Sequence, residues 1–570
     1  MKNKLSANLN RELVNLDKDS IVEIGRRFVE NNEWEIKNFP IWKVGIDVDW
    51  SADPFKNRSW TWNLHQWAFL PGLIAYDRRM EVVTGCTAGI RHARRWWGLF
   101  AEQASAPPMA WHDHGTALRA RNILLLMAQL EEHHGRYPDA EADIAFLRRI
   151  AVIHAETLLR EDFYSVGTNH GLDQSLVLFE LSQELPGFDA DGKATECARR
   201  RIAYEIGHAF APDGGHVENS TGYQNYGLVQ AQMAIQRLSA YDGAKVDVGL
   251  PEEVYDKAAL ALAFMSRPDG TLPLIGDTAF FTVRDIFSVK KPGKYSTYLY
   301  AVKSGKVGTP PASTDLVLPE SGWTILRSDW KGGADFARAV HIVFKSGFLS
   351  TYHRHDDDLA FSLFAFGAEW IIDGGLWKHQ PKDPMRIYLR SAAAHSLSAP
   401  LGVEASRDLD LVGSKSRIVS HETDGLRSTV TGESGMFVGF HSQRRLTYDR
   451  SRHTLRLDDS ISPVEDRAME MVASSLREGR ETFVTRFLVP GDKKVTILPE
   501  FGMATITGRG RTLTIAMAIV PVRMRLTKGV AKPRPFGWRS VQAGKIEPAW
   551  TIEFFHAMSS LDTSFALEWE

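Results

Sequence analysis

The spacing of apolar residues changes character about halfway along this chain of 570 residues. In the first half, apolar residues recur every three or four positions, as Leu172, Leu176 and Phe179 do, which is typical of amphipathic helices. From Gly322 onward, short runs of alternating apolar and polar residues are separated by Gly, Pro and Asp, which is typical of antiparallel strands. Helices followed by sheets, rather than a regular alternation of the two, indicate an α+β protein.

The elements that this change predicts can be placed along the chain. Helices are predicted over 63–78, 115–134, 141–160, 170–185, 194–210, 223–240 and 252–266. The clearest predicted strands cover 341–345, 454–457, 482–488, 512–520 and 551–556. Lys303–Ser313, rich in Gly, Pro and Ser, is typical of a linker. We predict two domains, with stacked helix pairs in an open ring or a solenoid over 1–310 and an antiparallel β-sandwich over 311–570.

The overall composition excludes several classes of function. A net charge of −2 provides no global positive field for nucleic acid or anionic membranes, and no apolar run reaches the length of a membrane span. The two cysteines, Cys86 and Cys197, provide neither a disulfide framework nor a thiolate metal site. The first residues are polar throughout, so we expect a cytoplasmic protein, or a periplasmic one if a signal segment has been removed.

Two local features would suit a polyanion or a sugar, but each has a simpler explanation. Arginines cluster at Arg91, Arg94 and Arg95 and again at Arg199, Arg200 and Arg201, where solvated helix faces are the favoured interpretation. The first fifth of the chain is rich in tryptophan, with Trp60, Trp62, Trp67, Trp96, Trp97 and Trp111. Aromatic faces pack well against sugar rings, yet core packing is the favoured role for each of them.

The stretch Ser350–Gly375 carries the strongest chemical signal. His353 and His355 are two residues apart, so in a strand both side chains would face one cavity. Asp373 and then His395 follow, and two histidines with a carboxylate form a zinc set that leaves one position open. We predict His355, Asp373 and His395 as metal ligands, which leaves His353 available for proton transfer.

Three other stretches combine residue types that can carry chemistry. Asn169 and His170 begin a predicted helix, where Asn169 is either a helix cap or part of a carboxylate-binding pair that uses the free backbone N–H groups. Tyr223 follows a polar, glycine-containing loop, so its phenol is expected at a cleft wall rather than in the core. His112, Asp113 and His114 could bind a metal, but a structural His–Asp pair is favoured there.

Taken together, these segments resemble the heparinase II/III family of polysaccharide lyases over nearly the whole chain. The resemblance is carried by segments that occur in the family's order: 111–114, 169–171, 218–223, 272–277, 321–330, 353–373 and 390–395. The chain differs from the family in having Ser396 and Leu397 after His395, where Asn-Thr is frequent.

The resemblance implies a fold, a reaction and a set of roles. The fold would be an incomplete (α/α) toroid followed by antiparallel β-sheets, and the reaction would be β-elimination at a 4-linked uronic acid. Asn169 and His170 would neutralise the uronate carboxylate, Tyr223 and His353 would transfer protons, and the three metal ligands would hold a structural zinc. We assign substrate contacts to residues within these segments or shortly after them, namely Trp111, His114, Arg119, Glu218 and Tyr226.

This chemistry explains why those residue types are needed. The C5 proton of a uronate is weakly acidic while the adjacent carboxylate is ionised, and hydrogen bonds to that carboxylate stabilise the charge that develops when the proton leaves. A base then removes the proton and an acid protonates the leaving O4. Tyrosine suits either task if nearby cationic groups lower its pKa.

Several substrates and functions stay open on the sequence alone. The first substrate expected is a heparin- or heparan-type glycosaminoglycan, as polymer or oligosaccharide. Alginate or oligoalginate is the alternative, and a mixed acidic polysaccharide is a third. Two other classes are a non-catalytic acidic-glycan-binding protein and a zinc hydrolase that uses metal-bound water. The oligomeric state is left open, with a homodimer among the options.

Overall fold

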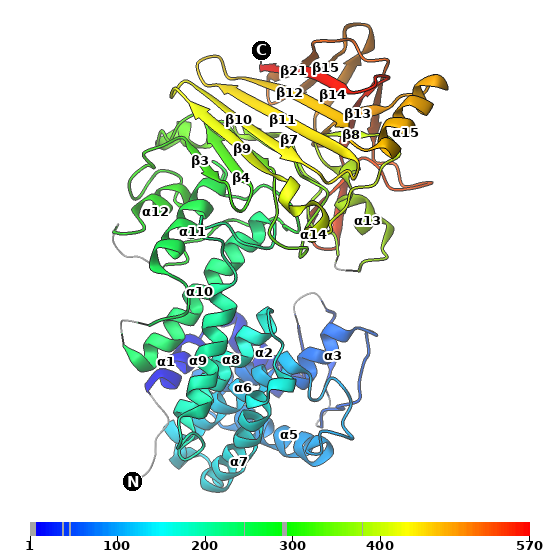
Figure 1. Cartoon of the computed structure of the whole chain (residues 1–570). Helices are drawn as coiled ribbons and strands as arrows, with labels where there is room; N and C mark the ends of the chain where they lie inside the picture. The colour runs from blue at the N-terminus through cyan, green and yellow to red at the C-terminus, as the bar shows by residue number, and fades with distance from the viewer. Residues whose placement is uncertain are drawn as a thin grey trace. The chain divides into compact units, whose positions relative to one another are not determined.

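The computed structural model describes residues 7–36, 39–44, 47–243, 246–287, 293–378 and 380–569. The chain divides into two compact units (Figure 1). Unit 1 comprises Met1–His208 and Met233–Leu250, and unit 2 comprises Ala209–Gln232 and Pro251–Glu570. The residues of helix α10 (Thr221–Asp242) are therefore shared between the two units. The domain boundary predicted after residue 310 stays a prediction.

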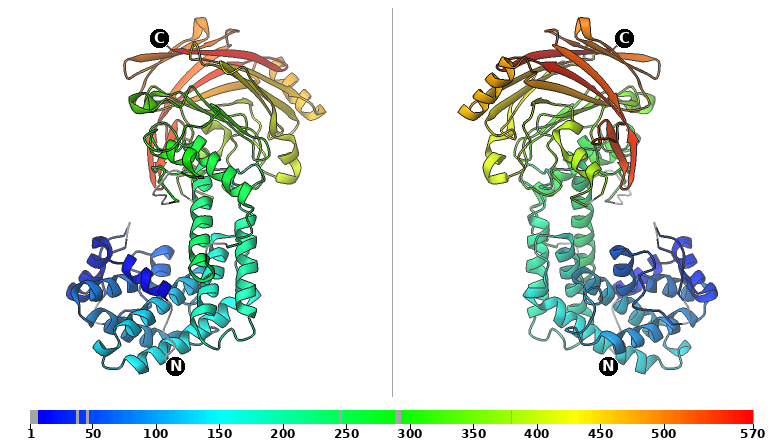
Figure 2. Two further views of the ribbon diagram at one scale, coloured as in Figure 1. Left: turned by 90° about the vertical axis from the view of Figure 1, so that its left-hand side faces the viewer. Right: turned by 90° about the vertical axis from the view of Figure 1, so that its right-hand side faces the viewer.

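Unit 1 is built from helices that pack side by side (Figure 2). They are α1 (Ala7–Asn15), α2 (Asp19–Asn31), α3 (Arg58–His65), α4 (Leu70–Met80), α5 (Thr84–Phe100), α6 (Asp113–Glu132), α7 (Ala140–Leu159), α8 (Asn169–Glu184) and α9 (Lys193–Gly207). A short hairpin of β1 (Glu33–Trp34) and β2 (Trp42–Lys43) accompanies them. Most predicted helices are confirmed within a few residues. The helix predicted over 63–78 is instead two helices, because Trp67 adopts a positive φ of 59° between α3 and α4.

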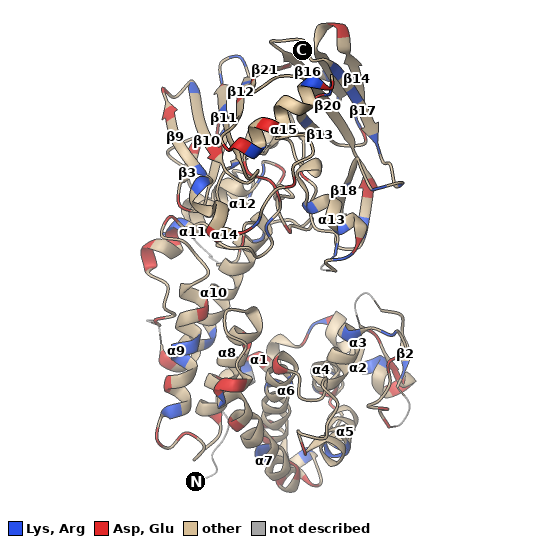
Figure 3. Cartoon of the chain, turned by 45° about the vertical axis from the view of Figure 1, so that its right-hand side comes forward, with Lys and Arg blue, Asp and Glu red and all other residues tan. Residues whose placement is uncertain are grey.

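The tryptophans of the first fifth of the chain mainly build the core of unit 1. Trp60, Trp67 and Trp96 are buried, and the rings of Trp67 and Trp96 meet edge to face with centroids 5.7 Å apart. The predicted arginine clusters are largely neutralised. Arg94 pairs with Asp143 at 2.7 Å, and Figure 3 shows basic and acidic residues interspersed along the helices. Core packing is thus confirmed for these tryptophans, and solvated helix faces are confirmed for the arginines except Arg201, which is buried and donates to the Leu158 carbonyl at 2.7 Å.

Unit 2 contains helices and three larger antiparallel sheets. The helices are α11 (Glu252–Met265), α12 (Ser296–Val302), α13 (Pro384–Arg390), α14 (Leu409–Val412) and α15 (Asp466–Arg477). The five-stranded sheet has the order β3 (Asp315–Leu318), β4 (Trp323–Arg327), β5 (His341–Lys345), β6 (Phe361–Ala365) and β7 (Ala368–Ile371). The four-stranded sheet has the order β17 (Arg523–Lys528), β20 (Trp550–His556), β13 (Phe483–Val489) and β8 (Ser398–Pro400).

The eight-stranded sheet is the largest. Its order is β14 (Lys494–Leu498), β15 (Met503–Gly508), β16 (Arg511–Met517), β21 (Leu561–Trp569), β12 (Thr454–Pro463), β11 (Phe440–Asp449), β10 (Arg427–Ser434) and β9 (Arg417–Thr423). A hairpin of β18 (Trp538–Gln542) and β19 (Lys545–Pro548) completes the unit. One hydrophobic core joins the three larger sheets, with Leu363, Phe487 and Phe565 contributed by different sheets. The predicted order of a helical part followed by antiparallel sheets is confirmed.

The prediction that His353 and His355 lie in a β-strand is wrong. Residues 350–360 form turns and loop between β5 and β6, and His353 adopts a positive φ of 54° that no β-strand contains. Phe366 and Gly367 both have positive φ in the tight β6–β7 connection. Among the described helices, none combines the length and apolar character that crossing a bilayer requires.

Candidate active site and metal site

The loop that carries His353 is fixed to the segment before α10. The side chain of Asn219 donates to the backbone carbonyls of Ser350, at 2.7 Å, and of Tyr352, at 3.0 Å. The Ser350 hydroxyl donates in return to the Val217 carbonyl at 2.8 Å. These hydrogen bonds bring two segments that are far apart in sequence together in unit 2, and a non-glycine residue held at positive φ is typical of functional sites.

His353 and His355 both bond to Asp277, although they do not lie in a strand. The Asp277 Oδ2 atom is 2.8 Å from His353 Nδ1, and Oδ1 is 2.8 Å from His355 Nε2. Because a carboxylate only accepts hydrogen bonds, both ring nitrogens donate to it. Arg386, on α13, forms a bidentate pair with the same carboxylate, with Nη2 at 2.6 Å from Oδ2. One buried carboxylate therefore orients the candidate proton-transfer histidine and a candidate metal ligand.

The electrostatics of Asp277 keep it ionised. Burial alone would raise the pKa of this carboxyl, but the hydrogen bonds from His353, His355 and Arg386 outweigh burial and hold the pKa well below its usual value. The unprotonated carboxylate can accept from both histidines at once, which fixes the tautomers of the two rings.

Tyr223 stacks on His353. The two ring centroids are 3.9 Å apart with an interplanar angle of 21°, so the pair required by the resemblance is adjacent. The position of Tyr223 in the first turn of α10 is fixed by the Gly222 N–H, which donates to the Thr278 hydroxyl at 2.9 Å. Thr278 directly follows Asp277, so one short segment positions both partners of the pair.

The surroundings of Tyr223 raise the pKa of its phenol. Burial, together with the negative charges of Glu218 and Asp277, raises the pKa of the phenol well above its usual value, and Arg386 opposes this only weakly. A neutral phenol is suited to donate a proton rather than to accept one. The condition that cationic groups lower the pKa of Tyr223 is therefore not met in the surroundings that unit 2 provides.

Glu218 and Tyr226 lie beside the same pair. The Glu218 Oε2 atom is 3.3 Å from His353 Nε2, and burial raises the pKa of Glu218. Tyr226 is exposed, and its ring meets that of Tyr223 with centroids 5.9 Å apart. Both residues therefore lie beside the stacked rings of Tyr223 and His353, the position that a contact with the bound sugar requires.

The three predicted metal ligands meet in the interior of unit 2. His355, Asp373 and His395 are all buried, and their candidate ligand atoms lie within 4.8 Å of one another. Asp373 lies two residues after the end of β7, and His395 follows the short turn after α13. The convergence that strand parity could not predict is thus produced by the loop around His355.

The donor set fits a zinc ion. The His355 Nδ1 and His395 Nε2 atoms are buried and have no hydrogen-bond partner among the described residues. His355 Nε2 donates to Asp277, which lies outside the candidate ligand set, so His355 Nδ1 is unprotonated and can bind a metal. This is the arrangement in which an outer carboxylate orients a metal-binding histidine. His395 Nδ1 lies 2.8 Å from Asp373, a contact between two members of the candidate ligand set.

A second cluster of candidate residues lies in unit 1. Asp113 accepts from His170 Nδ1 at 3.1 Å, and its other carboxylate oxygen lies 2.7 Å from His112 Nδ1. Burial would raise the pKa of Asp113, but these bonds and one from Ser165 lower it well below its usual value. The His170 ring also stacks on that of His114, with centroids 4.4 Å apart. The structural His–Asp pair expected at 112–114 is confirmed.

Helix α8 is capped at its N-terminus by Thr168 and not by Asn169. The Thr168 hydroxyl accepts from the Gly171 N–H at 3.1 Å and caps the helix, whereas Asn169 is the first helical residue and is exposed. The suggestion that Asn169 caps this helix is therefore wrong, and its amide is not engaged in capping. Asn169 and His170 lie in unit 1, whereas Tyr223 and His353 lie in unit 2.

Two predicted substrate contacts are placed in the core. Arg119 is fully buried, donates to the His65 carbonyl at 2.8 Å and lies 4.0 Å from the centroid of the Trp96 ring. Trp111 is buried as well and donates its indole N–H to the Phe100 carbonyl at 2.7 Å. Both side chains therefore belong to the core of unit 1 rather than to an exposed substrate-binding surface.

Sequence reasoning missed Asp277 and Arg386 as members of the site. Asp277 ends one of the segments that carry the family resemblance, and an acidic residue after a Pro- and Gly-containing turn was the available signal. Arg386 lies on α13, a helix of 7 residues that no apolar periodicity reveals. Their role became visible only through their hydrogen bonds to distant residues.

Two family models match this chain. The heparinase II/III N-terminus model matches residues 2–291, and the heparinase II/III-like C-terminal model matches residues 310–558. The chain therefore belongs to the heparinase II/III family, and with it to the carbon–oxygen lyases that act on polysaccharides.

Individual relatives agree with this assignment. The chain is 20% identical to a heparin-sulfate lyase of Pedobacter heparinus over 488 residues, which are 79% of this chain and 70% of the relative. A crystal structure of heparinase III superposes with a TM-score of 0.76 at 15% identity, covering 100% of this chain and 87% of that one. A heparan sulfate lyase from Pedobacter heparinus gives a TM-score of 0.68 at 15% identity, covering 97% and 83%. The solved structures share the fold of helices followed by antiparallel sheets.

Proposed function

We propose that this protein cleaves a heparin- or heparan-type glycosaminoglycan by β-elimination at a 4-linked uronate. The observation that carries the proposal is the stack of Tyr223 on His353, with His353 Nδ1 bound to Asp277. The relatives named for heparin and heparan sulfate support this choice of substrate. The proposal assigns to Asn169 and His170 the hydrogen bonds that neutralise the carboxylate of the bound uronate.

The proposed proton transfers follow from the state of each ring. His353 donates through Nδ1 to Asp277, so in the neutral ring Nε2 carries the lone pair and can remove the C5 proton. The electrons of the broken C5–H bond form the C4–C5 double bond, and the C4–O4 bond breaks. Tyr223, a neutral phenol, donates its proton to the leaving O4. A proton transferred from His353 to the adjacent phenolate restores both groups.

The stacked geometry also selects a stereochemistry. Ring centroids 3.9 Å apart leave no room for a sugar between Tyr223 and His353, so both groups reach the substrate from one side. In a 4-linked glucuronate the C5 hydrogen and O4 lie on the same face of the ring, whereas in iduronate they lie on opposite faces. We therefore propose syn elimination at glucuronate.

The metal in this proposal is structural. Zinc held by His355, Asp373 and His395 would fix the loop that carries His353, and it would supply no group to the reaction. Asp277 transmits this fixation, because it bonds His355 with one oxygen and His353 with the other.

The activity is tested by following the near-ultraviolet absorbance of the conjugated double bond over a panel of glycans. The panel contains heparan sulfate, heparin, chemically desulfated heparin, alginate and an iduronate-rich substrate. We expect product from the glucuronate-containing heparan-type substrates and mass analysis that shows an unsaturated uronate at the new end. The absence of unsaturated product from every uronate polymer and oligomer would rule out the proposed function.

Other outcomes would identify the alternatives. Unsaturated product from alginate alone would change the substrate class while keeping the reaction. Binding without any product, unaffected by Tyr223→Phe, would indicate a glycan-binding protein. Hydrolysis without a new chromophore, fully lost on chelation, would indicate a zinc hydrolase.

A further inference from the structure

Unit 2 contains a cavity lined by arginines beside α13. Its volume is about 360 Å³, at the lower end of the range of small-ligand sites. Four arginines line it, namely Arg386, Arg390, Arg407 and Arg486. Apolar side chains, among them Ile387 and Leu401, form another part of the wall. A wall of this composition can hold an anionic group while packing against the ring that carries it.

Three of the four arginines are neutralised within the fold. Arg386 pairs with Asp277, Arg486 donates to Glu553 at 3.1 Å, and Arg407 forms a bidentate pair with Asp356 at 2.7 and 2.9 Å. These carboxylates are thereby occupied. The remaining acidic residue on the wall, Glu404, is exposed to solvent.

Arg390 is held without a carboxylate. Its Nε and Nη2 atoms donate to the Arg354 carbonyl at 3.1 and 2.8 Å, and within the described part of the chain no carboxylate oxygen lies within 4.0 Å of its guanidinium. Burial lowers the pKa of Arg390, and the charges of Arg407 and Arg386 lower it further. A half-buried cation beside two others is a position that an added anion would stabilise.

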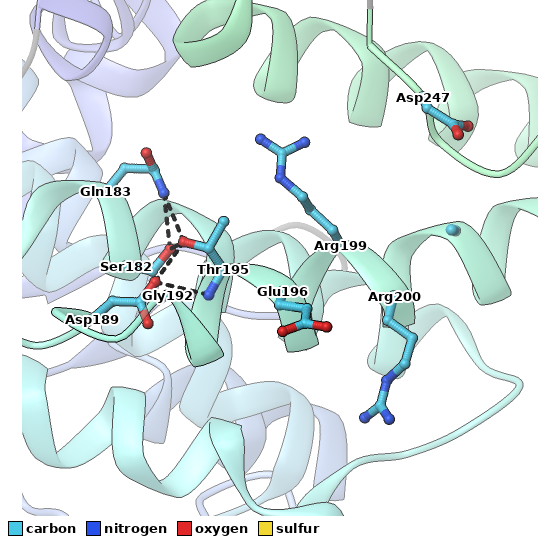
Figure 4. Close-up of a pocket in the computed structure, with 10 residues that line it drawn as sticks. Ser182, Gln183, Asp189, Gly192, Thr195, Glu196, Arg199, Arg200 and Asp247 are labelled. Carbon is cyan, nitrogen blue, oxygen red and sulfur yellow. Dashed lines mark hydrogen bonds between the residues drawn. The ribbon is translucent and has the colours of Figure 1, made fainter.

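A larger hollow in unit 1 provides the contrast. It has a volume of about 840 Å³ and contains Arg199 and Arg200 (Figure 4). Arg199 is bound to Asp242 at 2.6 Å and Arg200 to Glu161 at 2.6 Å, so each of these arginines already has its counter-ion. The cavity of unit 2 therefore offers the better site for an anion.

The cavity adjoins the candidate active site. The carbonyl that Arg390 holds belongs to Arg354, which lies between His353 and His355. Arg386, on the cavity wall, bonds the carboxylate that orients both histidines. An anionic group in the cavity would thus lie next to the site of elimination within unit 2.

We propose that this cavity binds an anionic substituent, a sulfate or a carboxylate, on the sugar that neighbours the cleaved uronate, with Arg390 as its counter-ion. The proposal rests on the proposed function, and it assigns to unit 2 a subsite for the charge pattern of the substrate. Bidentate recognition by a guanidinium suits both oxyanions, so the experiment must separate them.

The test changes the charge of the cavity without touching its arginines. Arg390 is unsuitable for substitution because it also holds the Arg354 carbonyl beside the two histidines. Ile387 lines the cavity and is 56% exposed, so both Ile387→Glu and Ile387→Gln should fold. The two variants have nearly the same shape and differ by one negative charge. Both are made in a Tyr223→Phe background, so that the ligand is not consumed.

Binding is measured by calorimetry with a sulfated heparin oligosaccharide, its desulfated form and inorganic sulfate. We expect the Kd of the sulfated oligosaccharide to be at least about fivefold higher for Ile387→Glu than for Ile387→Gln, because a charge placed within a Debye length of the anion repels it. If this ratio disappears with the desulfated oligosaccharide, sulfate is the bound group. If the ratio persists with the desulfated oligosaccharide, the carboxylate is the bound group. Competition by millimolar inorganic sulfate would support the first case.

Equal Kd values for the two variants with both oligosaccharides would overturn the proposal, as would failure of the Tyr223→Phe chain to bind either one. The measurement does not depend on turnover. Charge-dependent binding by the Tyr223→Phe variants, together with a wild-type enzyme that forms no unsaturated product, would refute the proposed lyase activity while retaining the subsite. If the wild-type enzyme forms unsaturated product but the two variants have equal Kd values, the lyase activity is retained and the subsite is refuted.

Discussion

Asp277 and His353 are joined by a hydrogen bond of 2.8 Å, and the other oxygen of the same carboxylate lies 2.8 Å from His355. One side chain thereby orients two histidines with different proposed roles, one in proton transfer and one in metal binding. His353 lies 76 positions after Asp277 in the sequence and His355 lies 78 positions after it, so these hydrogen bonds join distant parts of the chain. Removal of this carboxylate should therefore affect the orientation of both histidines.

Asp277→Asn should remove the orientation of His353 while keeping the shape of the side chain. An amide can accept from only one histidine, and its NH₂ group would face the other and reverse the tautomer of that ring. We expect kcat to fall at least about 100-fold, the size of a general acid–base contribution, with KM changing far less. The measurement is the initial rate of unsaturated product over a range of substrate concentrations.

Asp315→Asn provides the matched control. Asp315 is also a buried carboxylate bound to an arginine, Arg450, and to a histidine, His421 at 2.9 Å. It lies on β3, and among the described residues it has no hydrogen bond or ion pair to a member of the site. Both variants should lose stability on the order of 3 kcal/mol, because each leaves a buried arginine without its partner. Equal losses of kcat in the two variants would show that Asp277 acts through stability alone.

Tyr223→Phe should abolish proton donation to O4 with little effect on the fold. The stacked contact with His353 is retained by phenylalanine, so we expect the free energy of unfolding to stay within about 0.5 kcal/mol of the wild-type value. The rate of elimination should fall at least about 100-fold. A variant that keeps more than a tenth of the wild-type kcat would exclude the phenol as the acid. The measurements are urea unfolding and product absorbance on the same preparation.

Removal of the metal should affect stability before chemistry. His355 Nδ1 is buried without a partner in the described chain, so loss of the ion leaves this atom uncompensated. We expect dialysis against a chelator to lower the Tm by about 5–10 °C, and added zinc to restore it. The measurement is calorimetric melting combined with the metal content per chain.

Matched histidine variants separate metal binding from the loss of a buried histidine. His395→Ala should retain no zinc and show no further change in Tm on chelation. His421→Ala, which removes a histidine bound to Asp315 elsewhere in unit 2, should keep its zinc and its chelator-dependent shift. Wild-type protein that is purified without metal and gains no stability from zinc would contradict the assignment.

How much of the site the sequence could reveal depends on the range of the interactions. The change of periodicity predicted the order of helices and sheets, since it reflects local burial, and the family resemblance placed Tyr223 and His353 in one site. Strand parity failed at His353, because the loop adopts a positive φ that the residue types do not announce. Asp277 and Arg386 could not be assigned, since they are 109 positions apart and meet only through tertiary packing. Burial of Arg119 was likewise hidden, because a charged residue type predicts exposure unless its partners are known.

Acid should weaken unit 2 through Glu369, on β7. This carboxylate lies between Arg267 and Arg539, with Oε2 2.6 Å from Arg539 Nη1. Burial would raise the pKa of Glu369, but the two arginines outweigh burial and lower the pKa from 4.5 to about 2. Because the unfolded chain binds this proton more readily, the ion pairs contribute fully above about pH 4.5 and are lost as the pH falls toward 2.

The size of this effect is on the order of 3 kcal/mol, from the free energy that corresponds to each unit of pKa shift. It is measured as the difference in unfolding free energy between wild-type protein and Glu369→Gln, determined in urea at several pH values. The other carboxylates titrate in both proteins, so their contributions cancel in this difference. We expect the wild-type advantage to shrink as the pH falls below about 4.5, since the glutamine variant has no proton to gain at this position. A difference that stays constant with pH would mean that Arg267 and Arg539 do not hold Glu369 ionised in the folded protein.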